Sequence, residues 1–289
     1  MTLQTETSLD SYNDLDIWPL ERTLAALIDS SSAAVEAVRR ALPDLERAAT
    51  GIERALTAGG RLIYLGAGTS GRLAVQDAAE LPPTFGFEDA YAVLAGGDDA
   101  GERALEAAED DENDARARLS ALSLTHRDAV VGLAASGSTP FTVAGVTFAR
   151  AQGAFTVGIA NNAGTPLLSA AEVGVPLETP PEVLAGSTRL AAGTAQKVAL
   201  NALSTAVLVR LGGAYGNLMV GMRPQNHKLR GRAARIVVQA TGCTPAEAEA
   251  ALAAGLSIRV AIVTLLTGVS PAVAGERLAQ RHDRVREAL

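Results

Sequence analysis

The chain has 289 residues, 48% of them hydrophobic, and a formal net charge of −7 from 25 basic and 32 acidic side chains. This length permits one large α/β domain and a smaller one. Because the chain is acidic and its basic residues cluster only in residues 227–235, we expect no nucleic-acid partner.

The chain begins with a polar, acidic segment, residues 1–16, that has the features of neither a signal peptide nor a transit peptide. The longest apolar run, residues 260–269, is too short to span a bilayer. The single cysteine, Cys243, excludes an intramolecular disulfide and suits a reducing compartment. We therefore expect a cytoplasmic protein with no membrane partner.

Helical and strand-like patterns alternate through the first part of the chain. Helical patterns at residues 20–28 and 33–56, the second interrupted at Pro43, precede the first strand. The strand-like runs are residues 61–66, 91–95, 129–134, 154–160 and 173–177. Strands that alternate with helices form parallel sheets covered on both faces. The pattern predicts an α/β fold, a three-layer αβα sandwich around a five-stranded parallel sheet.

From Gly186 onward the pattern is mostly helical, with one long run at residues 186–211 and an amphipathic, basic one at residues 226–241. Thr244 followed by Pro245 is typical of a helix start and opens a run of three short helices. We expect two domains, residues 1–241 and residues 242–289, the second of which is small and helical.

The first strand leads into a glycine-rich loop. Gly66, Gly68 and Gly71 formally satisfy the G-x-G-x-x-G pattern of dinucleotide sites, but no acidic residue closes the next strand to hold a ribose. The hydroxyls of Thr69 and Ser70, together with unpaired backbone N–H groups at the start of the following helix, suit a compact phosphate group. An ordinary glycine turn with a Ser or Thr helix cap is the alternative.

A second hydroxyl-rich loop follows the third strand. It contains Ser136, Gly137 and Thr139, and Pro140 stands where a helix would begin. In a parallel sheet ligands bind beyond the carboxyl ends of the strands, so the two loops can hold one phosphate from two sides. A helix-capping role for Ser136 or Thr139 is again the alternative.

Two carboxylates are candidates for acid–base chemistry. Glu80 is expected at the C-terminal end of a helix over residues 72–80 that Pro82 and Pro83 stop; the helix dipole there favours the protonated, acid form. Glu109 lies in the acidic run of residues 104–112, most of which must face solvent. The three histidines are isolated in the sequence, and no metal site is expected.

Longer motifs show a more specific resemblance. They are GAGTSGR at 66–72, DAAELPPTFG at 77–86, AASGSTP at 134–140, PEVLAGSTRL at 181–190, GTAQK at 193–197 and YGNLMV at 215–220. In this order, and over nearly the whole chain, they resemble the N-acetylmuramic acid 6-phosphate etherases, which carry a sugar isomerase (SIS) domain. The resemblance implies that the predicted sheet is of the SIS type.

The resemblance also implies a carbon–oxygen lyase of cell-wall (peptidoglycan) recycling. Such an enzyme cleaves the lactyl ether of N-acetylmuramic acid 6-phosphate to N-acetylglucosamine 6-phosphate and D-lactate, without a cofactor. In the ring-opened sugar the C2 proton is α to the aldehyde, so a base removes it, an acid protonates the departing ether oxygen, and water then adds. By motif match Glu80 is the acid and Glu109 the second carboxylate, which we assign as the C2 base.

The resemblance further implies which residues hold the substrate. The expected phosphate ligands come from the two loops and are Gly68, Thr69, Ser70, Ser136, Gly137 and Thr139. Family members are homodimers, and Glu182 belongs to a segment expected to line the pocket, either in its own subunit or in the neighbouring one.

The chain departs from the family pattern at three places. The family usually has Arg where Ser138 stands and an Asp near Gly221, and Thr5-Glu6 only partly reproduces its Thr-Glu-x-x-Asn-Pro segment. These departures leave the preferred substrate open.

Two other functions use the same loops. A non-catalytic sugar-phosphate sensor would bind the phosphate and cleave nothing; the presence of both Glu80 and Glu109 argues against it. An aldose–ketose isomerase would need a ring-opening group, commonly His or Lys, and no histidine lies in a phosphate loop.

Overall fold

The computed structural model describes residues 3–97, 99–103, 105–224 and 226–289. It divides into two compact units. The first comprises Met1–Ala78 and Asp89–Ser204, and the second comprises Ala79–Glu88 and Thr205–Leu289.

The first unit is built on a five-stranded parallel sheet with the order β2-β1-β3-β4-β5. Its strands are β1 (Leu62–Gly66), β2 (Ala90–Leu94), β3 (Ala129–Ala134), β4 (Phe155–Ala160) and β5 (Val173–Pro176). Each predicted strand is confirmed, with ends that differ from the prediction by one residue at most. The three central strands are buried throughout and almost entirely apolar, as is typical of parallel strands covered on both faces.

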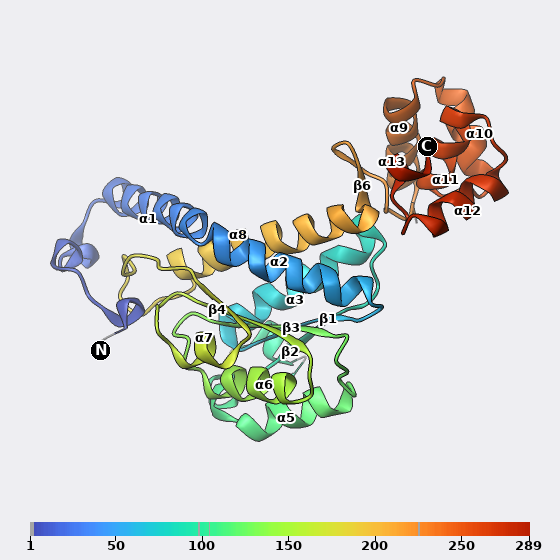
Figure 1. The fold of residues 1–289 in the computed structure, drawn as a ribbon. Helices are drawn as coiled ribbons and strands as arrows, with labels where there is room; N and C mark the ends of the chain where they lie inside the picture. Colours follow the sequence, from blue (N-terminus) through green and yellow to red (C-terminus); the bar gives the residue numbers. More distant parts are fainter. Residues whose placement is uncertain (1–2, 98, 104, 225) are drawn as a thin grey trace. The chain divides into compact units, whose positions relative to one another are not determined.

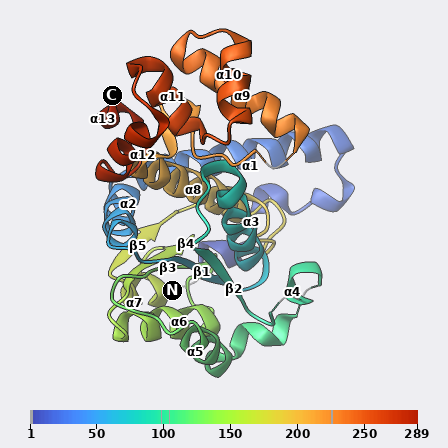
Figure 2. The ribbon, with the colours of Figure 1, turned by 90° about the vertical axis from the view of Figure 1, so that its right-hand side faces the viewer.

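Helices cover both faces of the sheet and complete the three-layer arrangement (Figure 1; Figure 2 gives a second view). The helices α2 (Leu42–Thr57), α3 (Gly68–Phe85) and α8 (Ala191–Leu208) lie on one face, and α5 (Glu112–Ala121), α6 (Pro140–Ala151) and α7 (Pro166–Ala170) lie on the other. The predicted three-layer αβα sandwich is therefore confirmed.

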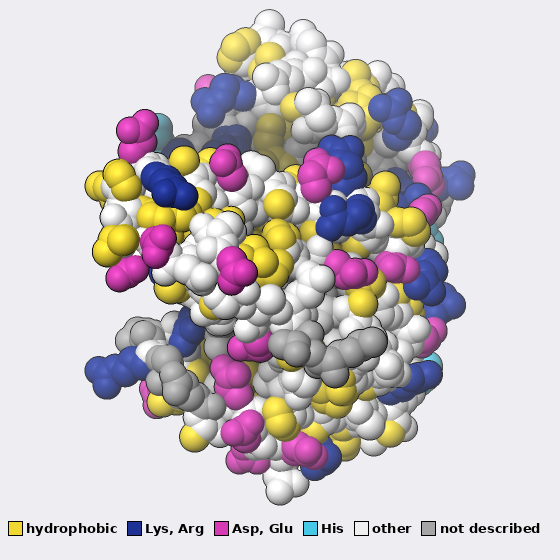
Figure 3. All heavy atoms as spheres, turned by 90° about the vertical axis from the view of Figure 1, so that its left-hand side faces the viewer, with side chains coloured by type: hydrophobic (Ala, Val, Ile, Leu, Met, Phe, Trp, Pro, Cys, Tyr) yellow, Lys and Arg dark blue, Asp and Glu magenta, His cyan; other side chains and the backbone are white. Residues whose placement is uncertain are grey.

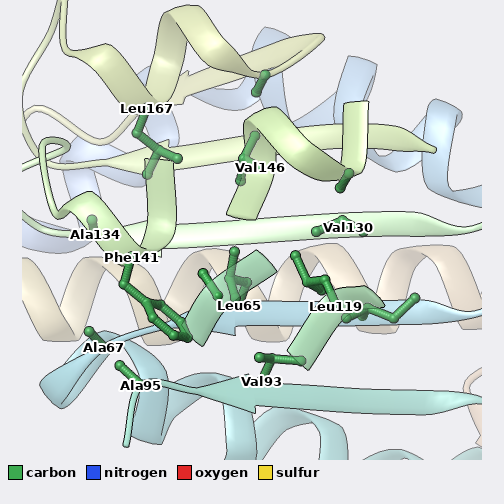
Figure 4. Close-up of a cluster of buried hydrophobic side chains, with 14 of the residues drawn as sticks. Leu65, Ala67, Val93, Ala95, Leu119, Val130, Ala134, Phe141, Val146 and Leu167 are labelled. Atoms are coloured by element: carbon green, nitrogen blue, oxygen red, sulfur yellow. The ribbon is translucent and has the colours of Figure 1, made fainter. Parts of the chain in front are cut away.

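The core on the α5–α6 face extends along the sheet as far as its carboxyl edge (Figure 4). Leu65 and Val130 from the central strands pack there with Leu119 of α5 and Val146 of α6. The fully buried ring of Phe141 lies beside Ala67 and Ala95, which follow β1 and β2. This packing fixes the first turn of α6 against the residues that directly follow β1 and β2.

The N-terminal part is more continuously helical than predicted. Helix α1 (Leu20–Arg40) includes residues 29–32, for which no helix was expected, and is followed by α2 with Pro43 in its first turn. The serines in that stretch weaken the sequence signal, but Ser31 and Ser32 donate their hydroxyls back to the carbonyls of Leu27 and Ile28 and so remain compatible with a helix.

Pro82 and Pro83 do not stop α3, contrary to the prediction. The helix continues to Phe85 and ends at Gly86, whose φ is +68°. Proline has a φ angle compatible with a helix and removes only its own N–H donor, so near a C-terminus the helix survives the loss. The Gly86 N–H donates to the Pro82 carbonyl and closes the last turn.

The second unit is helical. After the short strands β6 (Ala214–Tyr215) and β7 (Leu218–Met219) come α9 (His227–Thr241), α10 (Pro245–Ala253), α11 (Ile258–Thr267), α12 (Pro271–Gln280) and α13 (Val285–Ala288). Residues 242–289, all of which are described, hold four helices where three were predicted. The predicted domain boundary at residue 242 falls inside this unit, because Ala233 and Val237 of α9 belong to one apolar core with Ile262 of α11.

Within the described residues, no single helix has both the length and the apolar composition needed to cross a membrane. The helices α11 and α12, which are bent by 112° relative to each other, reach the required length and apolar composition only when they are counted as one segment.

An ion pair closes the amino edge of the sheet. Asp128, buried just before β3, accepts hydrogen bonds from the Arg61 backbone N–H, Nε and Nη2, and from the Thr125 N–H and hydroxyl. Burial alone would raise the pKa of Asp128, but the hydrogen bonds from Arg61 and Thr125 outweigh it and lower the pKa from 3.8 to about 2.

We predict that Asp128→Asn lowers the free energy of unfolding by about 2–3 kcal/mol, because the new amide places a donor against donors. Since the folded pKa is about 2 and the ordinary value 3.8, the contribution of Asp128 is complete above pH ~4 and is lost as the pH falls toward 2. Denaturant unfolding from pH 7 to pH 2 should therefore show the two proteins converging. Asp29→Asn, at an exposed position, is the control. A constant difference across this range would contradict the assignment.

Candidate functional site

The two hydroxyl-rich loops begin next to each other in space. Strands β1 and β3 are paired in parallel, and Gly66, the last residue of β1, is opposite Leu133. In a sheet of order 2-1-3-4-5 the crossovers from these two strands leave to opposite faces, which opens a crevice between their carboxyl ends. The structure thus confirms that the loops share one sheet edge.

The first loop depends on its glycines. Helix α3 begins at Gly68, whose φ is +52°. A Cβ atom on Gly71 would lie 2.6 Å from the Gly66 carbonyl oxygen and 2.3 Å from Leu94 Cδ1, so only glycine lets α3 approach β1 this closely. Ser70 is buried in the first turn of α3 and Thr69 is half-buried. The Gly71 N–H donates to the Ala67 carbonyl. The N–H groups that precede it have no partner within the helix, as at any helix start, and can serve an anion.

The second loop is held from beneath by a neighbouring loop. Gly137 has a φ of +74°, and a Cβ atom there would lie 2.2 Å from Thr165 Oγ1. The Ser136 hydroxyl accepts the Ser138 N–H at 3.2 Å, and Thr139 stands at the N-cap of α6 without a side-chain cap bond. Capping therefore does not account for the Thr139 hydroxyl, whereas Ser136 is used in a local turn.

The N-terminal segment is attached to the second loop. The sequence analysis noted Thr5 only as part of an incomplete family motif and did not predict this attachment. Asn162 donates from Nδ2 to the carbonyls of Ala135 and Ser136 and to the Thr5 hydroxyl, and its Oδ1 accepts the Thr5 N–H. Thr5 and Asn162 are both buried. This network ties Thr5 to the loop and fixes the carbonyls of Ala135 and Ser136.

The Glu109 carboxylate lies against the first loop. A Cβ atom on Gly68 would be 2.7 Å from Glu109 Oε1, which is closer than such atoms approach in folded proteins. Glu109 is half-buried in the short helix Glu106–Asp110. The structure therefore brings one of the two predicted catalytic carboxylates to the predicted phosphate loop.

Glu80 is an exposed residue of α3 and belongs to the second unit. Because α3 continues to Phe85, Glu80 lies in the helix interior and not at its C-terminal end, so the dipole argument made from the sequence does not apply. The pairing of Glu80 with Glu109 stays a prediction.

Glu182 has a structural partner that the sequence did not reveal. Its side chain is 1% exposed, and its two carboxylate oxygens accept the N–H groups of Ala191 and Ala192, each at 2.9 Å. A carboxylate at this end of α8 satisfies otherwise unpaired N–H groups and complements the helix dipole. Within the chain Glu182 thus positions α8; direct substrate contact stays a prediction.

A buried polar cluster joins α3 and α8 behind the site. The Tyr64 hydroxyl donates to Asp77 Oδ2 at 2.6 Å, and the Ser204 hydroxyl donates to Asp77 Oδ1 at 3.4 Å. Burial, reinforced by the charge of Asp77, raises the pKa of Tyr64 well above its ordinary value of 10. Tyr64 therefore remains a neutral hydrogen-bond donor. The sequence analysis missed this cluster, although Asp77 stands at the start of one of the motifs.

The structure shows the surroundings of two positions, Ser138 and Gly221, at which the chain departs from the family pattern. Ser138 is exposed and its N–H is used by Ser136. A Cβ atom on Gly221 would lie 2.2 Å from the Phe85 carbonyl oxygen, so no side chain fits there. Among the described residues, no group of three or more His, Cys, Asp or Glu side chains is arranged to hold a metal ion.

Two protein-family models match the chain. One is the glucokinase regulatory protein N-terminal SIS domain, over residues 44–150, and the other is the SIS domain, over residues 110–206. A solved structure of a putative phosphosugar isomerase involved in capsule formation from Bacteroides fragilis is similar in fold, with a TM-score of 0.52 at 19% identity; 69% of this chain and 95% of that chain are covered.

Two relatives match from end to end. The chain is 46% identical to an N-acetylmuramic acid 6-phosphate etherase of Deinococcus radiodurans, with 99% of this chain and 95% of that protein covered. It is also 46% identical to one of Streptomyces coelicolor, with 100% and 94% covered.

We predict that Gly68→Ala weakens binding of N-acetylglucosamine 6-phosphate by about tenfold or more. A left-handed conformation costs a residue with a Cβ about 1–2 kcal/mol, and the methyl group must displace the Glu109 carboxylate. Calorimetric titration measures the change. Gly275→Ala is the matched control, because its Cβ would meet nothing within 4 Å. Equal affinities for both variants would show that this loop does not hold the ligand.

Proposed function

The chain belongs to the N-acetylmuramic acid 6-phosphate etherase family, and on that premise we propose how its residues carry out the reaction. The enzyme is a carbon–oxygen lyase with a SIS domain. It converts N-acetylmuramic acid 6-phosphate to N-acetylglucosamine 6-phosphate and D-lactate.

The phosphate group is held between the loops that follow β1 and β3. Backbone N–H groups at the start of α3 and the hydroxyls of Ser70, Ser136 and Thr139 supply donors from two sides. The Ser136 hydroxyl can donate to a phosphate while it accepts the Ser138 N–H, since a hydroxyl does both. An anchored phosphate fixes the sugar and so places C2 and C3 for reaction.

Glu109 removes the C2 proton of the open-chain sugar, and Glu80 donates a proton to the ether oxygen at C3. The electron pair of the C2–H bond forms a C2–C3 double bond as the C3–O bond breaks, and D-lactate leaves with the proton from Glu80. Water then adds to C3 of the unsaturated aldehyde and a proton returns to C2. The position of the Glu109 carboxylate, 2.7 Å from where a Cβ atom on Gly68 would be, is the observation that supports this arrangement most directly, because the base would then lie next to the phosphate anchor.

We propose that the enzyme is a homodimer. Leu20, Leu24 and Ile28 occur at intervals of four residues along α1, are 73%, 50% and 65% exposed, and form one apolar stripe. Apolar side chains reach the surface between charged ones on the face drawn in Figure 3, which looks onto the N-terminal helices. A stripe of this kind is typical of a surface that another chain covers. A shared pocket would allow the exposed Glu80 to serve a site formed by two subunits.

The proposed setting is the cytoplasm, where the enzyme would act in peptidoglycan recycling. The lone cysteine supports a reducing compartment.

The first test is lactate release from N-acetylmuramic acid 6-phosphate in H₂¹⁸O. We expect lactate without label and N-acetylglucosamine 6-phosphate labelled at C3, because water adds to that carbon after elimination. Binding without lactate would indicate a sensor, and a ketose product without lactate would indicate an isomerase. Either result would overturn the proposal.

The roles of the carboxylates can be separated in D₂O. Glu80→Gln and Glu109→Gln should each lower kcat by about 10²–10⁴-fold with little change in ligand affinity. Glu80→Gln should still exchange the C2 proton of N-acetylglucosamine 6-phosphate for deuterium, whereas Glu109→Gln should not. The exposed Glu276→Gln is the matched control. Exchange retained only by Glu109→Gln would reverse the assignment.

The dimer is tested by light scattering coupled to size exclusion. Leu24→Glu combined with Ile28→Glu places two charges on the stripe of α1 and should yield monomers with a folded circular dichroism spectrum. Val273→Glu, at an exposed apolar position of α12, should leave the dimer intact. A dimer that survives both changes on α1 would exclude this stripe as the interface.

A further inference from the structure

The chain contains two lysines, and their environments differ sharply. Lys228 lies exposed near the start of α9. Lys197 lies in the first half of α8, and its Nζ atom is buried without a hydrogen-bond partner among the described residues. An ammonium group that is removed from water without a partner destabilises the fold. A lysine at such a position is therefore explained best if a bound anion pairs with it.

The start of α8 is fixed at the carboxyl edge of the sheet. Asn161, directly after β4, donates to the carbonyls of Leu177 and Ala192 and accepts a hydrogen bond from Gln196 Nε2 at 3.0 Å. Together with the two bonds that Glu182 accepts from the first N–H groups of α8, this network leaves the helix little freedom to shift.

The face of α8 that carries Lys197 packs along α3. A Cβ atom on Gly193 would lie 3.5 Å from Thr69 Cγ2 of the first loop, and Ser204 donates to Asp77 further along both helices. Lys197 follows Gly193 by four residues and precedes Ser204 by seven, so all three share one face. Side chains on a helix lean toward its N-terminus, which directs the Lys197 side chain back toward Gly193 and Thr69.

A positive charge is what the two loops lack. Residues 66–71 and 135–140 contain neither Lys nor Arg, and a phosphate monoester carries a charge of about −1.5 to −2 at pH 7. Arg72, the nearest basic residue in the sequence, donates from Nε and Nη2 to the carbonyls of Ala100 and Arg103, each at 3.0 Å. Arg189 is exposed.

We propose that Lys197 Nζ is the cationic contact of the substrate's phosphate group, which deepens the proposed function and rests on its phosphate site. The ammonium completes a site whose other ligands are hydroxyls and backbone N–H groups.

The test compares Lys197→Met with Lys228→Met. Calorimetry should show that Lys197→Met weakens binding of N-acetylglucosamine 6-phosphate by about 10- to 100-fold, the loss expected for one charged hydrogen bond, and leaves the weak binding of N-acetylglucosamine unchanged. Without ligand, its thermal midpoint should equal or exceed that of the wild type, because an unpaired buried charge is removed. Lys228→Met should change neither quantity.

Two results would overturn the proposal: unchanged affinity for the phosphorylated sugar, whether or not kcat falls, or an equal loss of affinity for both sugars. If Lys197→Met does not fold, the wild type provides the answer. Lysine-selective ¹³Cε labelling gives one signal per lysine, assigned with Lys228→Arg, and inorganic phosphate should shift the Lys197 signal alone. A phosphate titration that leaves this signal in place would also overturn the proposal. Both measurements are independent of lactate release, so failure of the etherase assay would be recognised separately.

Discussion

The pairing of β1 with β3 is the constraint on which the rest of the site depends. It places Gly66 opposite Leu133 and so starts two strand-to-helix loops side by side at one edge of the sheet. Glycine then keeps each loop tight: Gly71 allows α3 to approach β1 closely, and Gly137 lies directly against Thr165. We propose that a compact anion binds where the two loops meet, because unpaired N–H groups at the start of a helix favour one.

Buried amides and carboxylates hold the surrounding segments to that edge. Asn161 fixes the start of α8, Asn162 fixes both the second loop and the N-terminal segment, and Glu182 caps α8. Each of these groups is nearly or fully buried and hydrogen-bonded, which makes the arrangement rigid and specific. Binding and chemistry can then rely on positions that do not have to be reorganised when the substrate arrives.

The sequence was sufficient where a local pattern decides the outcome and insufficient where distant residues meet. Apolar runs gave the five strands to within a residue, and glycine with hydroxyls marked both loops. The capping of α8 by Glu182, the bond between Thr5 and Asn162, 157 residues apart, and the burial of Lys197 arise from tertiary contacts that no spacing rule reports. The prediction that Pro82 and Pro83 end α3 was wrong because a helix tolerates the loss of a few N–H donors close to its end.

The central claim is that one phosphate group is held from both loops at once. A crystal structure with bound N-acetylglucosamine 6-phosphate tests it most directly. The account predicts phosphate oxygens within hydrogen-bonding distance of the hydroxyls of Ser70, Ser136 and Thr139. A phosphate bound by only one of these loops, or bound elsewhere on the protein, would contradict it.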